Sequence, residues 1–374
     1  MFRLPRLRHS QKQLQHVRSI FKLFGHEKQI DLLNNSAVTV REPEYPVSLT
    51  GRPRLTELSL KGVAKYMMTA QCQNILVLSG HGISAPAGIP NYMKYGGIEA
   101  RKLMGETGWT EKEDAKELFA KHYFSVMPYG MLRFVQSLWP GNHRPTYAHY
   151  FIRTLQEKGL LLRNWTENLD NLEKVCGIRD DKLVEFFGSF LRWKCENKAC
   201  ETTYDLLWLK ERLEMFQFPN CSKCFEKTAP DIRWYHECSN SIIRQADVDA
   251  ANCDLLIVIG SDLFMAPFCE IPKHVPWDVP RLVINDKTIE NDADVMDLNV
   301  YFDFDSENAY RDVLWEGNTD LGVLSLCSYL QWDRDVKFVM ESDTALLPTR
   351  REIQERLGMV RNEDERKKPL PKLR

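Results

Sequence analysis

Four cysteines in the middle of the chain have the spacing of a metal site. Cys195 and Cys200 are separated by four residues, and after twenty more residues Cys221 and Cys224 are separated by two. Two such pairs of thiolates can close around one zinc ion in a tetrahedron that leaves no open position for a substrate. The spacing therefore predicts a structural zinc ion that holds a small module together. The other six cysteines have no such spacing and are expected to be buried thiols.

A glycine-rich segment follows a short apolar run near the start of the chain. Residues 80–84 read Gly-His-Gly-Ile-Ser, and Gly88 comes four residues later. Glycines let backbone amides approach a pyrophosphate, and the start of a following helix favours its negative charge. The spacing differs from the usual dinucleotide fingerprint, and a tight turn between a strand and a helix explains the glycines equally well.

A polar cluster follows a second apolar run. Residues 166–170 read Thr-Glu-Asn-Leu-Asp. Amide and carboxylate groups such as those of Asn168 and Asp170 can hold a ribose or a small polar ring. The same side chains can instead cap the helix that follows, and the segment alone leaves both interpretations open.

The elements that would position these groups are short apolar runs separated by helical lengths. The runs cover residues 74–79, 161–165, 255–259 and 281–284. Such runs are typical of buried parallel strands, and intervening segments such as residues 147–157 have a helical pattern. A doubly wound α/β sheet binds its ligand at the carboxyl ends of its strands, so the pattern predicts a nucleotide site there.

Composition excludes some classes of partner. The chain has 374 residues, 43% hydrophobic and 27% charged, with a formal net charge of −2. A net charge this close to zero gives the protein no overall electrostatic field that would attract nucleic acid or an anionic membrane. No stretch approaches the roughly 20 apolar residues of a membrane helix. Without a secretory signal pattern, ten cysteines indicate a reducing compartment.

The sequence resembles those of the sirtuins, which are NAD-dependent protein-lysine deacylases. The resemblance is carried by three features in this order, namely the glycine segment, the cluster of Asn168 and Asp170, and the four cysteines. The resemblance runs from about residue 58 to residue 330. It is strongest to the cytoplasmic subgroup that deacetylates tubulin and histones, in stretches such as residues 159–163.

The resemblance implies a domain organisation. Residues 55–345 would form a Rossmann-type domain with a smaller domain inserted at about 96–145 and 191–228. The smaller domain would consist of the zinc module and a helical lobe. Residues 1–54 are predicted to be a helix and a linker, and residues 346–374 a charged, disordered tail.

The resemblance also implies a set of site residues. Asn168 and Asp170 match contacts to nicotinamide and ribose close to the reacting atoms. The residues that match cofactor contacts of the family are Gly80, Gly82, Ile83, Ser84, Gly88, Asn168, Asp170, Gly260, Ser261 and Asn285.

One departure from the family bears directly on the reaction. The family's proton acceptor is a histidine, and this chain has Phe187 at that position. A phenyl ring accepts no proton, and loss of a general base typically costs about 10²–10⁴ in rate. We therefore predict that deacetylase activity is lost or nearly lost.

Other departures affect the cofactor and the peptide. Met93 stands where the family has an arginine, His81 where it has an alanine, Glu167 where it has a glutamine and Asp262 where it has a serine. A carboxylate about 4 Å from a phosphate costs on the order of 1–4 kcal/mol, so NAD binding is predicted to be weak or absent. In the strand that binds the substrate peptide, Arg233 replaces an apolar residue and His236 a glycine.

These departures predict a binding or scaffold protein with a structural zinc ion and a partner peptide, acetylated or not, in the former substrate cleft. The alternatives are a weak residual NAD-dependent protein deacylase or ADP-ribosyltransferase, or recruitment of His81 or His236 as a new base.

The N-terminal segment leaves the compartment open. Residues 1–26 are basic and contain no acid, as in a mitochondrial presequence. The same segment places Leu14, Val17, Phe21 and Leu23 on an amphipathic helix with the spacing of an export signal. The resemblance favours the cytoplasm, with shuttling to the nucleus.

Overall fold

The computed structural model describes residues 54–89, 91, 128–139, 141–215, 218–233, 239–263, 265–286, 302–304, 306–307 and 309–345. In these residues six strands form one parallel sheet with the order β3-β2-β1-β7-β8-β9. The strands are β1 (Ile75–Ser79), β2 (Leu161–Thr166), β3 (Leu183–Glu185), β7 (Leu255–Ile259), β8 (Arg281–Asn285) and β9 (Asp312–Glu316).

The strand order makes this a doubly wound sheet. The chain starts in the middle at β1, builds β2 and β3 outward on one side, and then crosses over to build β7, β8 and β9 on the other. The switch point between β1 and β7 is where such sheets bind ligands. The predicted fold class is confirmed. All four predicted strands are present, whereas β3 and β9 were not predicted.

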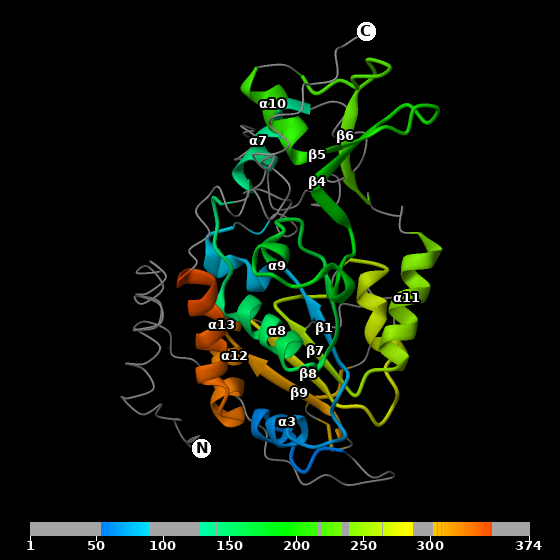
Figure 1. Ribbon diagram of the computed structural model, residues 1–374. Coiled ribbons are helices and arrows are strands. Elements are labelled where there is room, and N and C mark those ends of the chain that lie inside the picture. The colour runs from blue at the N-terminus through cyan, green and yellow to red at the C-terminus, as the bar shows by residue number, and fades with distance from the viewer. Residues whose placement is uncertain are drawn as a thin grey trace, which may run out of the picture.

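Helices cover both faces of the sheet (Figure 1). One face carries a layer of α3 (Leu60–Met67), α8 (Tyr147–Glu157), α12 (Thr319–Leu330) and α13 (Asp333–Ala345). The other face carries α11 (Asn240–Ala251) and the 3-10 helix η5 (Phe268–His274). Among the described residues no helix has the length and apolar character needed to span a membrane.

The two-sided cover explains the continuous apolar runs of the sequence. Along β1, Ile75 and Val77 pack into the core on the α12 face, while Leu76 and Leu78 pack into the core on the α11 face. All five residues of β1 are buried, as are all five of β7. A strand buried on both faces favours apolar side chains along its length, not only at alternate positions.

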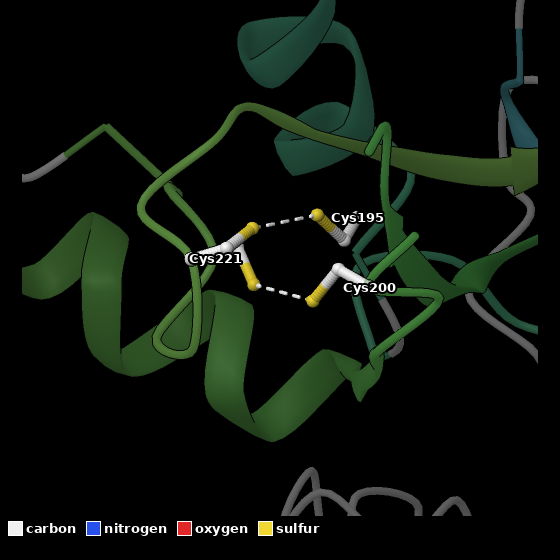
Figure 2. A group of neighbouring side chains, drawn as sticks. Cys195, Cys200 and Cys221 are labelled. Atoms are coloured by element: carbon white, nitrogen blue, oxygen red, sulfur yellow. Dashed lines mark hydrogen bonds between the residues drawn. The ribbon is translucent and has the colours of Figure 1, made fainter. Parts of the chain in front are cut away.

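A second, antiparallel sheet lies beyond the large one and carries the four cysteines. Its order is β5-β4-β6, with β4 (Gly188–Cys195), β5 (Thr203–Asp205) and β6 (Thr228–Ile232). The helix α10 (Leu206–Glu214) packs on β4, and α7 (Pro128–Ser137) lies at the same end of the molecule (Figure 1). Figure 2 shows Cys195, Cys200 and Cys221 pointing toward one another. The predicted domain boundaries stay predictions, since both termini and most of the predicted helical lobe lie outside the described residues.

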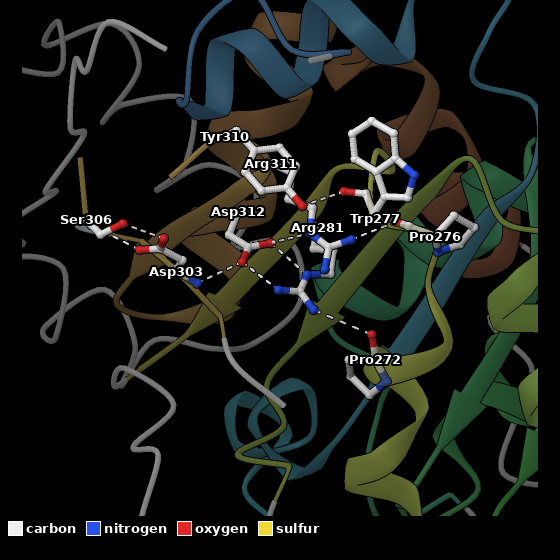
Figure 3. Close-up of polar contacts among 9 residues, drawn as sticks. All are labelled: Pro272, Pro276, Trp277, Arg281, Asp303, Ser306, Tyr310, Arg311 and Asp312. Carbon is white, nitrogen blue, oxygen red and sulfur yellow. Dashed lines mark hydrogen bonds and ion pairs between the residues drawn. The ribbon is translucent and has the colours of Figure 1, made fainter. Parts of the chain in front are cut away.

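A buried ion pair joins β8 to β9 at their first residues. Arg281 Nε lies 2.7 Å from Asp312 Oδ1, and Arg281 Nη2 lies 2.6 Å from Asp312 Oδ2 (Figure 3). The Asp303 backbone amide donates to Asp312 Oδ2 at 2.8 Å, and the guanidinium lies 4.4 Å from the centre of the Phe302 ring. Both charged side chains are almost fully buried, so each depends on the other for its stabilisation.

Substitution Asp312→Asn should destabilise the fold strongly. It leaves the buried Arg281 without its counter-charge, and breaking a buried pair in this way costs about 3–5 kcal/mol. Urea unfolding would measure the loss. Glu57→Gln is the matched control because Glu57 pairs with Lys65 at the surface, where a pair contributes about 0–1 kcal/mol. Equal losses in the two variants would contradict the role assigned to the buried pair.

Candidate functional site

The loops that follow β1 and β7 are packed backbone to backbone. The Gly80 amide donates to the Ile259 carbonyl at 3.1 Å, and the Gly82 amide donates to the Gly260 carbonyl at 2.7 Å. A Cβ atom on Gly82 would lie 2.5 Å from Gly260 Cα. Gly260 also has a φ of 64°, a backbone conformation that favours glycine. These glycines are therefore required by the contact between the two loops.

The backbone amides of the glycine segment are largely used within the protein. The Ile83 amide donates to the Gly80 carbonyl at 3.1 Å and the Ser84 amide to the His81 carbonyl at 2.8 Å, in addition to the two bonds of Gly80 and Gly82. The His81 ring also turns back onto its own segment, with Nε2 2.9 Å from the Ile89 carbonyl oxygen. The segment is a closed pair of 3-10 turns, η1 (His81–Ile83) and η2 (Ala85–Ala87).

A buried carboxylate, Glu173, organises the end of β2. Its Oε1 accepts from Thr166 Oγ1 at 2.6 Å and from Asn168 Nδ2 at 3.2 Å. Asn168 Nδ2 also lies 3.1 Å from the Gly80 carbonyl oxygen, which ties the end of β2 to the end of β1. Asn168 Oδ1 is buried and has no hydrogen-bond partner within the described structure. An acceptor in this state is available to a ligand that brings a donor.

Asp170 lies just before a short helix, and its two carboxylate oxygens differ in their contacts. Its Oδ1 accepts from the Leu172 amide at 3.0 Å, at the start of the short helix α9 (Leu172–Val175). Its Oδ2 is buried and unpaired in the part of the chain that the structure describes. Burial, with a further contribution from the charge of Glu173, raises the pKa of Asp170 to about 7. Asp170 therefore binds the first amide of α9, whose N-cap residue is Asn171, and also has a buried oxygen without a partner in the described residues.

His149 completes this buried group and was not singled out from the sequence. One of its ring nitrogens and the carboxylates of Asp170 and Glu173 lie within 4.8 Å of one another. The Thr146 amide donates to His149 Nδ1 at 3.2 Å, and burial lowers the pKa of the imidazole to about 3. The available sequence signal is the capping-box spacing of Thr146 and His149 at the start of α8.

Two further carboxylates bind the polar residues at the ends of β7 and β8. Ser261 Oγ donates to Glu167 Oε1 at 2.9 Å, and Asn285 Nδ2 donates to Asp262 Oδ1 at 2.7 Å. Ser261 and Asn285 are both buried. Glu167 Oε1 also lies against Gly80, since a Cβ atom there would be 2.3 Å away from it. Two predicted cofactor contacts are thus occupied by the chain's own acidic groups.

Phe187 lies in a buried aromatic cluster just after β3. Its ring centre is 5.1 Å from that of Phe186, edge to face, and 6.4 Å from that of Phe268. Phe186 also contacts Phe268 and Trp165, at 5.3 and 5.8 Å. Phe187 is only 6% exposed. The sequence analysis did not predict that Phe186 packs against Phe187, although two adjacent phenylalanines are visible in the sequence.

Arg233 is held against the backbone near Phe187. Its amide donates to the Phe187 carbonyl at 2.6 Å, and its Nη1 donates to the carbonyl oxygens of Glu185 and Phe186. The guanidinium thereby joins the end of β6 to the segment that carries Phe187. Met93 and His236 lie outside the described residues.

The four spaced cysteines are brought together as predicted. Cys195 and Cys224 Sγ are 3.4 Å apart, Cys200 and Cys221 Sγ are 3.7 Å apart, and all four lie within 4.8 Å of one another. Zn–S bonds of about 2.3 Å in a tetrahedron place sulfur atoms about 3.8 Å apart. The donor set and its spacing therefore fit a structural zinc ion.

The remaining thiols agree with the expectation of buried small side chains. Five of them are buried, and these are Cys72, Cys176, Cys253, Cys269 and Cys327. Burial raises the pKa of Cys72 to about 12, which keeps the thiol protonated. Cys238 lies outside the described residues.

Comparison with known proteins identifies the family. The model of the Sir2 family matches residues 80–267. The chain is 33% identical over 301 residues to the NAD-dependent protein deacetylase sirtuin-2 of Danio rerio, which covers 79% of this chain and 78% of that protein. The chain belongs to the Sir2 family.

Other Sir2 proteins match over similar spans. The NAD-dependent protein deacetylase sirtuin-3 of Mus musculus is 29% identical over 294 residues, which cover 78% of this chain and 82% of that protein. The NAD-dependent deacetylase sir2A of Dictyostelium discoideum is 33% identical over 300 residues, 77% of this chain and 55% of that protein. The resemblance to sirtuins is confirmed, while the roles of individual residues in this Sir2-family chain stay predictions.

Proposed function

We propose that this Sir2-family protein has lost, or nearly lost, NAD-dependent deacetylase activity and acts as a zinc-containing binding or scaffold protein. The observation that carries the proposal is Phe187. It stands where the resemblance to sirtuins implies a proton-accepting histidine, and its ring is packed against Phe186 and Phe268. A hydrocarbon ring in an apolar cluster accepts no proton at any pH.

Weak or absent NAD binding is the second part of the proposal. It is supported by Glu167 and Asp262, whose carboxylates accept the hydrogen bonds that Ser261 and Asn285 would otherwise give to a ligand. To bind there, a dinucleotide would have to break these bonds and place its phosphates near two negative charges. Such proximity costs on the order of 1–4 kcal/mol for each charge.

A partner peptide in the former substrate site is the proposed ligand of the scaffold. Arg233 supports this idea because its guanidinium ties the end of β6 to the segment of Phe187. The strand end that would bind the peptide is therefore held in place, although the proton acceptor of the reaction is missing. Cytoplasmic residence with nuclear shuttling is part of the same proposal and rests on the resemblance to the cytoplasmic subgroup, which favours an export signal over a presequence in the N-terminal segment.

The direct test is a deacetylation assay on an acetyl-lysine peptide with NAD, paired with calorimetric titration of NAD. The Danio rerio relative serves as the positive control. We expect a turnover rate lower than that of the relative by about 10²–10⁴ and no saturable NAD binding under conditions that saturate the relative. Turnover within about tenfold of the relative would contradict the proposal, because loss of a general base costs more than that.

The same samples distinguish the alternative activities. Release of nicotinamide without a peptide would indicate NAD hydrolysis, and label transfer from NAD to protein would indicate ADP-ribosyl transfer. Either reaction at a rate comparable to that of the relative would show that the protein is an enzyme and would contradict the scaffold proposal.

A further inference from the structure

We propose that Tyr204 and Thr202 set the affinity of the small module for zinc without being ligands of the metal. Each of them donates its hydroxyl proton to a neighbouring cysteine thiolate. The inference rests on the structural zinc ion of the proposed function, and it adds the side chains that support the metal's ligands.

Strand β5 and the residue before it carry the two hydroxyl groups to the cysteine cluster. Tyr204 Oη lies 3.1 Å from Cys221 Sγ, and Thr202 Oγ1 lies 3.1 Å from Cys200 Sγ. The segment is fixed on β4, because β5 pairs with β4 and the Cys195 amide donates to the Thr202 carbonyl at 2.8 Å. The two sulfur atoms that these hydroxyls contact lie 3.7 Å apart (Figure 2). Both hydroxyls therefore support the same edge of the cluster.

The direction of the Tyr204 bond follows from the other partner of its oxygen. The Ser222 amide donates to Tyr204 Oη at 2.8 Å, so this oxygen already accepts one hydrogen bond and has its own proton to give. A cysteine that binds zinc is a thiolate, which has no proton and can only accept. Tyr204 is therefore the donor in its contact with Cys221.

The Thr202 hydroxyl has two acceptors within reach. Its Oγ1 lies 3.4 Å from the Cys200 carbonyl oxygen and 3.1 Å from Cys200 Sγ. A charged acceptor makes the stronger hydrogen bond, and here the sulfur is also the nearer of the two atoms. The proton of Thr202 therefore goes to the thiolate when Cys200 binds zinc.

The ring of Tyr204 is held in place by α10. It stacks on Trp208 with the ring centres 3.9 Å and the ring planes 22° apart. Trp208 Nε1 donates to Ser222 Oγ at 3.3 Å, and Arg212 Nη2 donates to the same oxygen at 3.4 Å. The same helix thus positions the tyrosine and the residue that follows Cys221.

Hydrogen bonds to the sulfur atoms should strengthen zinc binding. Four thiolates around a divalent ion leave an excess of negative charge, and donors that point at the sulfur atoms disperse it. Substitution of a hydrogen-bond partner of a metal ligand typically costs about 10–100-fold in metal affinity. Cys221 also accepts from the Lys223 amide at 3.4 Å, so loss of the Tyr204 hydroxyl leaves this thiolate with a donor and should cost the lower part of that range.

The first test is a competition titration of the full chain against a chromogenic zinc chelator. Tyr204→Phe retains the ring that stacks on Trp208 and removes only the hydroxyl. We expect its zinc affinity to fall by about tenfold or more. Thr203→Val is the matched control, because it removes a hydroxyl from an exposed side chain of the same strand. It should leave the affinity unchanged.

The second test is the absorption spectrum of the protein with cobalt(II) in place of zinc. Thiolates bound to cobalt give a sulfur-to-metal charge-transfer band, and a hydrogen bond to sulfur lowers the energy of its electrons. Tyr204→Phe should therefore move the band to longer wavelength, and Thr203→Val should not. Thr202→Val should move it in the same direction, and this variant decides the question if Tyr204→Phe fails to fold.

Two results would overturn the inference. One is a zinc affinity of Tyr204→Phe equal to that of the unmodified chain. The other is a band that stays in place, even with weaker zinc binding, because the tyrosine would then support only the packing of the module. Neither test uses NAD or a peptide, so deacetylase activity in the turnover assay would contradict the proposed function and leave this inference intact.

Discussion

Removal of bound zinc should unfold the three-stranded sheet while the six-stranded sheet stays folded. The four cysteines hold the end of β4 to the loop before β6, and a structural zinc ion of this kind binds with about 10–16 kcal/mol. The core on the α12 face of the parallel sheet contains no residue of the small module, so we expect the large sheet to stay folded without the metal. We expect about one zinc ion per chain in freshly purified protein. After chelation, limited proteolysis should cut first between residues 196 and 227.

The control for the metal site is a thiol outside the cluster. Cys221→Ser should reproduce the effect of chelation, whereas Cys253→Ser, at a buried thiol of the main core, should leave the zinc content at the level of the unmodified protein. Purified protein without zinc would contradict the prediction that the metal holds the small module together. Unchanged proteolysis after chelation would contradict it as well.

The large sheet was predictable where every position of a strand is apolar. The run from Leu255 to Ile259 became β7 with the predicted bounds, because burial on both faces demands apolar residues throughout. The strand β9 was missed because it begins with Asp312 and ends with Glu316. The buried charge of Asp312 is paired with Arg281, which is 31 positions away, and a pairing over this distance has no local sequence signal.

The site was predictable in its composition but not in its contacts. The glycine segment, Asn168, Asp170 and the cysteines were identified from residue type and spacing. The contact between Gly82 and Gly260 joins loops that are far apart in sequence, so the purpose of these glycines is visible only in the fold. The bonds of Glu167 to Ser261 and of Asp262 to Asn285 have the same origin, because the strand ends lie along one edge of the parallel sheet and bring distant residues together.

The substitution Phe187→His should not restore deacetylation and should destabilise the protein. The Phe187 ring packs against Phe186 and Phe268, and loss of buried aromatic contacts costs about 3–5 kcal/mol in full truncation. An imidazole there retains some packing but needs a partner for its N–H group, and the ring neighbours are hydrocarbon. Burial of an unpaired polar group adds about 1–3 kcal/mol. Thermal unfolding and the deacetylation assay would measure the two effects.

Phe187→Leu is the matched control for packing, since it removes the aromatic ring without adding a polar group. It should be less destabilised than Phe187→His and equally inactive.

The triple variant Phe187→His/Glu167→Gln/Asp262→Asn separates the two defects, because it restores a base and also removes the two carboxylates that follow β2 and β7. If Phe187→His alone gave turnover within about tenfold of the Danio rerio relative, the absence of a base would be the sole defect. The carboxylates would then have no part in suppressing the reaction.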